Sequence, residues 1–110
     1  MSGIKLLVDT NAVIKHLEGE KQVEAILNGS LVFISSITYA ELLAGPLTPV
    51  AKQVLEEYLA DTHIIHTNNF ICETASMLRQ TVRLKLPDAL IAATSLFVSR
   101  HSVAHFQQRF

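Results

Sequence analysis

The segment Lys5–Leu17, KLLVDTNAVIKHL, joins two patterns that predict different secondary structures. The residues from Ile4 to Val8 form a short apolar run, which is typical of a strand that is buried on both faces. From Ala12 onward the apolar residues recur at helical spacing, which predicts an amphipathic helix. Asp9 lies at the boundary between the two patterns. Because an apolar run ends on a carboxylate where the periodicity changes, Asp9 is a candidate site residue.

The rest of the chain continues this alternation of apolar runs and helical patterns. Further strands are expected at residues 31–35, 63–66 and 96–99, and helices at residues 11–18, 22–27, 38–44, 49–60, 69–84 and 88–95. Buried strands separated by helices predict a parallel sheet with helices on both faces. The expected fold class is therefore α/β, a small parallel-sheet sandwich, and the length allows residues 1–110 to form one domain.

The composition limits the classes of function. The net charge is −1, so an anionic partner must be met by a local basic patch or by bound metal ions. No run approaches the roughly 20 apolar residues that span a bilayer, and we expect no membrane partner. The lone cysteine, Cys72, excludes an intramolecular disulfide. With no signal peptide at the start of the chain, it is consistent with a cytoplasmic protein.

Three acidic residues are expected at the carboxyl edge of the sheet, where ligands bind in open α/β folds. Asp9 ends the first strand, Glu41 lies in the first turn of the helix after the second strand, and Asp88 lies in the first turn of a later helix. Clustered carboxylates repel one another unless a cation binds them, and Mg²⁺ and Mn²⁺ prefer such oxygen ligands. This grouping suits hydrolysis of a phosphodiester by an activated water molecule.

Each acid also has a purely structural interpretation. Asp9 is a favoured N-cap for the helix that follows it. Thr38 and Glu41 have the spacing of a capping box, in which the glutamate returns to the backbone of the cap residue. Asp88 suits the positive end of a helix dipole. The expected meeting of all three acids at one sheet edge favours the functional interpretation.

Three segments resemble the three sequence blocks of the PIN-domain family, close to its VapC-type toxin branch. They are LLVDTNAVIKHL, ISSITYAELLAG and LKLPDALIAATS, and they occur in the family's order across residues 4–95. The resemblance implies a PIN-like fold and an endoribonuclease that depends on Mg²⁺ or Mn²⁺. It also implies a homodimer, an RNA substrate and a cognate antitoxin protein that covers the site.

The resemblance assigns roles at five positions of this chain. The carboxylates that it implies as metal ligands and catalytic residues are those of Asp9, Glu41 and Asp88. It implies supporting polar roles for Thr10 and Asn11, such as orienting a carboxylate or the substrate by hydrogen bonds.

The C-terminal segment departs from the family pattern. LFVSRHSVAHFQQRF follows the third block almost at once, and its VAHF stretch resembles the family's ending. Ser102 falls where the family has Asn or Asp, and is therefore the positional match for a further supporting residue. The connecting segment is short, so the C-terminal strand is expected to be shortened or displaced.

Basic residues lie near two of the acids. Arg79, Arg83 and Lys85 form a stripe that leads to Asp88, and Lys15 has a comparable place on the first helix. Such a stripe is usually a solvated helix face. On a ribonuclease these side chains would contact RNA phosphates, because such contacts position a substrate without reading its sequence.

Two other functions are compatible with parts of the sequence. A degenerate, non-catalytic PIN-like module that binds a partner protein or RNA would explain the short C-terminal region and Ser102. An aspartyl-phosphate protein is disfavoured. The phosphatase pattern needs a second Asp two residues after Asp9, where this chain has Asn11, and the signal-receiver pattern needs acids before Asp9, where it has none.

Overall fold

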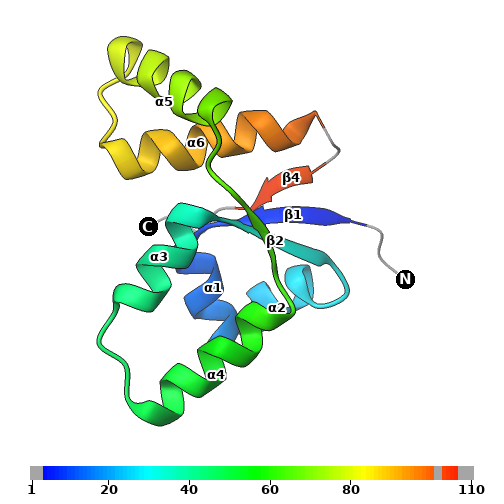
Figure 1. Cartoon of the computed structure of the whole chain (residues 1–110). Helices are drawn as coiled ribbons and strands as arrows, with labels where there is room; N and C mark the ends of the chain where they lie inside the picture. Colours follow the sequence, from blue (N-terminus) through cyan, green and yellow to red (C-terminus); the bar gives the residue numbers. More distant parts are fainter. Residues whose placement is uncertain (1–3, 101–102, 107–110) are drawn as a thin grey trace.

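The sheet lies between two layers of helices (Figure 1). The computed structural model describes residues 4–100 and the backbone of residues 103–106. Its strands run parallel in the order β3-β2-β1-β4. They are β1 (Lys5–Val8), β2 (Leu31–Ser35), β3 (His63–Ile65) and β4 (Val103–Phe106). The predicted α/β class, a parallel sheet covered on both faces, is confirmed.

Except for α2, the helices begin where the sequence offers a capping side chain or a proline. They are α1 (Thr10–Leu17), α2 (Lys21–Leu27), α3 (Ser36–Ala44), α4 (Pro49–Ala60), α5 (Asn69–Thr81) and α6 (Leu86–Ser99). The residues before α1, α3, α4 and α5 accept a backbone hydrogen bond with a side-chain oxygen, as N-caps do. Gly19 and Gly29, after α1 and α2, have positive φ angles that end each helix at little cost.

Strand β1 contributes to the core on both faces of the sheet. Leu6 and Val8 pack with residues of α1 to α4, whereas Leu7 packs with Val98 of α6. This division follows from the strand period of two, which sends alternate side chains to opposite faces. Figure 1 shows the result, with α1 to α4 on one side of β1 and α5 and α6 on the other.

Small side chains set the packing of α5 against α6. Ala75 of α5 and Ala89 and Ala93 of α6 are almost fully buried, together with Ile71. Because alanine adds little bulk, the two helix backbones approach closely. Phe97 and Ile65 extend this cluster to the sheet, so α6 is fixed relative to the strands.

The C-terminal strand differs from its prediction. Residues 96–99, expected as a strand, form the last turn of α6, and the strand is Val103–Phe106. A short apolar run fits a buried helix as well as a strand, and here the helix period of α6 continues through Val98. Strand β4 pairs with β1 from Lys5↔Val103 to Val8↔Phe106, so it is not displaced from the sheet.

The boundaries of α3, α5 and α6 also differ from the sequence pattern, and α3 begins at Ser36 rather than at residue 38. Helix α5 ends at Thr81 rather than at residue 84, because Val82 adopts an extended conformation. Helix α6 begins at Leu86, with a proline in its first turn, and continues to Ser99 rather than to residue 95. Among the described residues, no helix combines the length and apolar character needed to cross a membrane.

A polar network ties α1, α2 and α4 together beside the core. His16 Nε2 lies 2.9 Å from Asn28 Oδ1, and His16 Nδ1 lies 2.8 Å from the Tyr58 hydroxyl. Because the Asn28 oxygen is an acceptor, Nε2 carries the proton and Nδ1 accepts from Tyr58. Burial raises the pKa of the Tyr58 phenol to about 12.

We expect Tyr58→Phe to lower the free energy of unfolding at pH 7 by about 1 kcal/mol, because His16 Nδ1 loses its donor. The neutral phenol is favoured in the folded state, so its stabilising effect is complete below pH 10 and is lost as pH rises toward about 12. The deficit of the variant should therefore shrink in that range. Urea unfolding at pH 7 and at alkaline pH measures both effects.

Tyr39→Phe is the matched control, because Tyr39 is a half-buried phenol outside this network. The control should keep the alkaline loss of stability that wild type shows. An alkaline loss as large in Tyr58→Phe as in wild type would contradict the assignment of that loss to Tyr58.

Candidate functional site

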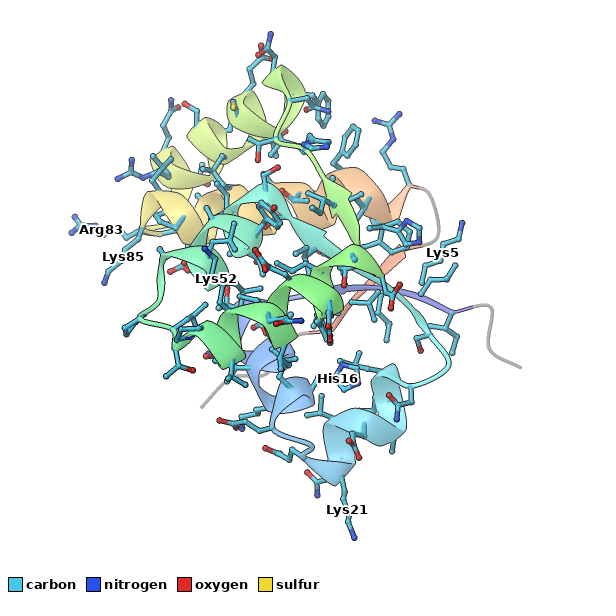
Figure 2. All side chains as sticks on the ribbon, turned by 60° about the horizontal axis from the view of Figure 1, so that its bottom comes forward. Lys5, His16, Lys21, Lys52, Arg83 and Lys85 are labelled. Carbon is cyan, nitrogen blue, oxygen red and sulfur yellow. The ribbon has the colours of Figure 1, made fainter. Side chains whose placement is uncertain are left out.

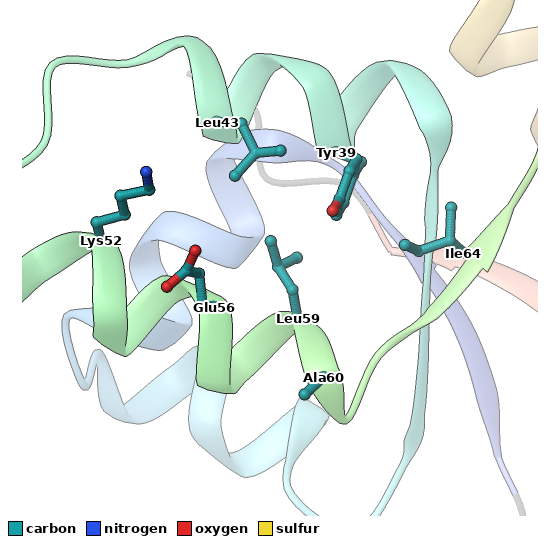
Figure 3. Close-up of a pocket in the computed structure, with 7 residues that line it drawn as sticks. All are labelled: Tyr39, Leu43, Lys52, Glu56, Leu59, Ala60 and Ile64. Carbon is teal, nitrogen blue, oxygen red and sulfur yellow. The ribbon is translucent and has the colours of Figure 1, made fainter.

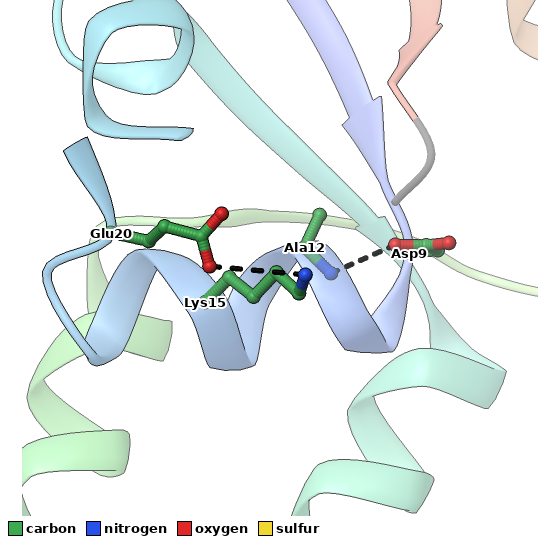
Figure 4. Close-up of polar contacts among 4 residues, drawn as sticks. All are labelled: Asp9, Ala12, Lys15 and Glu20. Atoms are coloured by element: carbon green, nitrogen blue, oxygen red, sulfur yellow. Dashed lines mark hydrogen bonds and ion pairs between the residues drawn. The ribbon is translucent and has the colours of Figure 1, made fainter. Parts of the chain in front are cut away.

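Asp9 lies directly after β1, and its side chain caps α1. Its Oδ1 accepts a hydrogen bond from the Ala12 N–H at 2.9 Å, and the residue is only 9% exposed (Figure 4). The structural interpretation of Asp9 as an N-cap is confirmed. A carboxylate offers about four acceptor positions, so capping the helix and binding a cation are compatible.

Glu41 is linked to the start of α1 by a hydrogen bond between side chains. The Thr10 hydroxyl donates to Glu41 Oε1 at 2.5 Å, across 31 positions of sequence. Because Thr10 directly follows Asp9, this contact connects α3 to the carboxyl end of β1. Two of the three predicted acids therefore belong to neighbouring parts of one sheet edge.

The capping box predicted for Thr38 and Glu41 is wrong. Helix α3 begins directly after β2, and its N-cap is Ser35, whose Oγ accepts from the Thr38 N–H at 3.0 Å. Since the helix starts earlier than its apolar pattern indicated, Glu41 lies in the second turn rather than the first. Its carboxylate takes no part in the cap and contacts Thr10 instead.

A buried polar pair at the end of β2 was not identified from the sequence. Ser35 and Thr38 are 1% and 0% exposed, and their hydroxyl oxygens lie 3.3 Å apart. Ser35 ends β2, which pairs with β1, and Asp9 directly follows β1. A serine directly after a buried strand, followed three residues later by threonine, is the signal that predicts this cap.

Asp88 lies at an exposed position in the first turn of α6. Helix α6 packs against α3, so the elements that carry Asp88 and Glu41 are neighbours. Its carboxylate is a suitable hard ligand for Mg²⁺. Within the part of the chain that the structure describes, however, no three His, Cys, Asp or Glu side chains are close enough to hold a metal ion. The described arrangement therefore connects Glu41 to the Asp9 end of β1 without forming a group of three ligands.

The basic candidates fall into two groups. Lys15 Nζ lies 3.8 Å from Glu20 Oε2, and Figure 4 shows this ion pair beside α1. Arg79 is exposed, and its Nε donates to the Leu84 carbonyl oxygen at 3.2 Å. Two further exposed cations follow in the turn before α6, Arg83 and Lys85.

The remaining supporting candidates have less structural context. Asn11 is exposed in the first turn of α1, directly after Thr10. Ser102 lies outside the described residues.

An open groove lies between α3 and α4. It has a volume of about 530 Å³, and Figure 3 shows Tyr39 and Leu43 of α3 facing Leu59 of α4 across it. Lys52 and Glu56 of α4 also line the groove. Leu43 in its lining is 40% exposed, and Leu47, in the connection between α3 and α4, is 39% exposed. A surface that is apolar but flanked by charges is typical of a protein contact.

The sequence was compared with known protein families. Residues 6–106 match the PIN domain family. The chain belongs to the PIN domain family. The match includes all three sequence blocks and all three candidate acids of this PIN domain.

Solved structures with this fold include toxin–antitoxin complexes. One, a toxin-antitoxin complex from Klebsiella pneumoniae, superimposes on this PIN domain with a TM-score of 0.76 and 31% identity, covering 92% of this chain and 83% of the other. VapBC2 from Rickettsia felis bound to a promoter DNA fragment has a TM-score of 0.73 and 15% identity, and the match covers 96% of this chain and 100% of the other. DNA-bound VapBC from Salmonella typhimurium has a TM-score of 0.69 and 16% identity, and the match covers 94% of this chain and 86% of the other. No curated protein matches.

The two substitutions Asp9→Ala and Asp9→Asn should affect the stability of the PIN domain differently. Alanine removes the acceptor for the Ala12 N–H, and we expect it to lower the free energy of unfolding by about 1 kcal/mol. Asparagine keeps a capping oxygen and should change stability by much less. Thermal and urea unfolding measure the difference, and equal losses in both variants would contradict the capping role.

Proposed function

We propose that this PIN domain is a divalent-metal-dependent endoribonuclease and the toxin of a toxin–antitoxin pair. The observation that carries the proposal is the connection between Asp9 and Glu41 at the carboxyl edge of the sheet, made through Thr10. PIN domains are generally nucleases. A structure that is 31% identical to this chain is described as a toxin-antitoxin complex, which supports the same function here.

In this proposal Asp9, Glu41 and Asp88 hold Mg²⁺ or Mn²⁺. Their carboxylate oxygens are the ligands that these hard cations prefer. A bound ion would supply Lewis-acid chemistry, activating water and stabilising charge on the leaving oxygen of the phosphodiester. The Asp9 side chain is held in place by the Ala12 amide, and the Thr10 hydroxyl orients Glu41.

The substrate in this proposal is RNA. Phosphate contacts are assigned to the exposed cations of the α5–α6 region, Arg79, Arg83 and Lys85. Lys15 is a weaker candidate, since it already lies beside Glu20. Asn11 and Ser102 are proposed to support the site or the substrate. We propose a cytoplasmic location, which is consistent with the free thiol of Cys72.

The protein partner in this proposal is a cognate antitoxin. The groove between α3 and α4 is the candidate contact surface, because it combines exposed apolar side chains with charged residues. Further candidate contacts, in the antitoxin complex or in a homodimer, are Ile26 and Tyr58. Ile26 is 45% exposed and is available, whereas Tyr58 is half-buried and bonded to His16.

A non-catalytic module that binds a partner protein or RNA is the second candidate. The observation that favours it is that the described residues form no group of three potential metal ligands. The two candidates differ in one measurable property, since only the nuclease needs Mg²⁺ or Mn²⁺ to cut RNA.

We expect purified protein to cleave RNA in Mg²⁺ or Mn²⁺ and to stop when the ions are chelated. Asp9→Asn should lower the cleavage rate by roughly 100-fold or more, because an amide is a poorer ligand than a carboxylate and loss of supporting groups alone costs 10- to 100-fold. Because asparagine still caps α1, the variant should remain folded. Gel analysis of labelled RNA measures the rate.

Asp61→Asn is the matched control for this charge change. Asp61 is exposed at the end of α4, away from the proposed ligands, and its substitution should leave cleavage unchanged. Cleavage that persists in Asp9→Asn at the wild-type rate would defeat the site assignment. Absence of metal-dependent cleavage in wild type would favour the non-catalytic module.

A second substitution tests the role of Thr10. Thr10→Val keeps the shape of the side chain but removes the hydroxyl that donates to Glu41, and we expect Mn²⁺ affinity to fall about tenfold. Isothermal titration calorimetry measures the affinity directly. Thr74→Val on α5, which removes a hydroxyl bonded to the Phe70 carbonyl, is the control and should bind Mn²⁺ as wild type does. Unchanged affinity in Thr10→Val would show that Thr10 does not position Glu41 for metal binding.

A further inference from the structure

We propose that the turn between α5 and α6 is a preformed docking element for the phosphate backbone of RNA. We call residues 82–85 the cationic turn, after its side chains Arg83 and Lys85. The inference deepens the proposed function and rests on it, since it assigns the residues that hold the substrate of that site.

The backbone of the cationic turn is held by hydrogen bonds from α5 and from within the turn. The Val82 N–H donates to the Leu78 carbonyl at 2.7 Å, and the Leu84 N–H donates to the Val82 carbonyl at 2.8 Å. Arg79 Nε donates to the Leu84 carbonyl at 3.2 Å, so a side chain of α5 bridges the turn. A backbone held at three points loses little entropy when a ligand binds its side chains.

Apolar packing also holds the cationic turn against α5 and α6. Leu84 packs against the cluster of small residues between α5 and α6, which includes Ala75 and Ala89. Lys85 then occupies the N-cap position of α6 in an extended conformation, and its carbonyl accepts from the Ala89 N–H at 2.9 Å. The turn is therefore joined rigidly to both helices.

The two cationic side chains project into solvent from this fixed base. Arg83 and Lys85 are both exposed, and Figure 2 shows them extending from the same side of the molecule. Among residues 4–100, no ion pair with an acid involves Arg83 or Lys85. In a chain whose net charge is −1, residues 79–88 carry three basic residues and one acid.

The location of the cationic turn relates it to the proposed metal ligands. Asp88 follows Lys85 by three residues and lies in the first turn of α6. RNA phosphates held by Arg83 and Lys85 would therefore pass close to the N-terminal end of α6. The charges would hold the nucleotides that flank the cleaved bond, without selecting a base sequence.

The experiment measures RNA binding without cleavage. In full-length Asp9→Asn protein, the additional pair R83A and K85A should weaken binding of a fluorescein-labelled single-stranded RNA of mixed sequence by roughly tenfold at moderate salt. The slope of log Kd against log salt concentration should fall by about 1.4, since each phosphate contact to a single strand contributes about 0.7. Fluorescence anisotropy during a potassium chloride titration gives both values.

The pair K5A and K21A in the same background is the matched control. Both lysines are exposed, their loss changes the net charge equally, and Figure 2 places them away from Arg83 and Lys85. This control should keep more than half of the affinity and nearly the whole salt slope. An equal loss in both double variants would mean a diffuse charge effect, and an unchanged slope in R83A/K85A would overturn the proposal.

The outcome is separable from that of the proposed function. If wild type cleaves RNA with metal but R83A/K85A binds RNA as tightly as its parent, the docking role fails and the nuclease assignment stands. If wild type shows no metal-dependent cleavage while the cationic turn still determines RNA affinity and salt slope, the nuclease fails and the docking role holds in an RNA-binding module.

Discussion

The structure depends on the burial of β1 on both faces of the sheet. Leu6 and Val8 belong to the core under α1 to α4, and Leu7 belongs to the core under α6. A shift of this strand by one residue would exchange the two faces and disrupt both cores. The register of β1 is therefore strongly specified, and with it the position of Asp9, where the chain leaves the sheet.

The three candidate acids differ in how firmly the fold holds their side chains. Asp9 is buried and held by a backbone amide. Glu41 is exposed and held by one side-chain hydrogen bond from Thr10. Asp88 is exposed and positioned only by the placement of α6. The fold thus positions the first acid fully and the third acid only through the helix that carries it.

The sequence predicted the bounds of helices and strands well where the hydrophobic pattern was long or where proline, glycine or a capping residue marked the ends. Helix α4 and strand β2 have the predicted bounds, because Pro49 and the residues around Gly29 and Ser35 mark their ends. Prediction failed where a short apolar run was ambiguous, as at residues 96–99. There the helix period of α6 continues through Val98, which packs against Leu7 of β1.

The candidate site was less predictable than the fold for a related reason. Helical periodicity located α3 but not its first turn, because the cap is decided by Ser35 and its hydrogen bond to Thr38. Because α3 begins earlier than expected, Glu41 is not a capping residue and instead accepts a hydrogen bond from Thr10. Side-chain pairing across distant elements depends on the relative placement of helices, which composition and spacing do not encode.

The charge distribution constrains how such a chain can hold an anionic substrate. With acids slightly in excess overall, long-range attraction of RNA is weak, and binding must come from local contacts. A flexible pair of cations would lose side-chain and backbone entropy on each contact. The bridge from Arg79 to the Leu84 carbonyl removes the backbone part of that cost before any ligand arrives. A small, nearly neutral domain can then use two well-placed cations where a basic protein would use many.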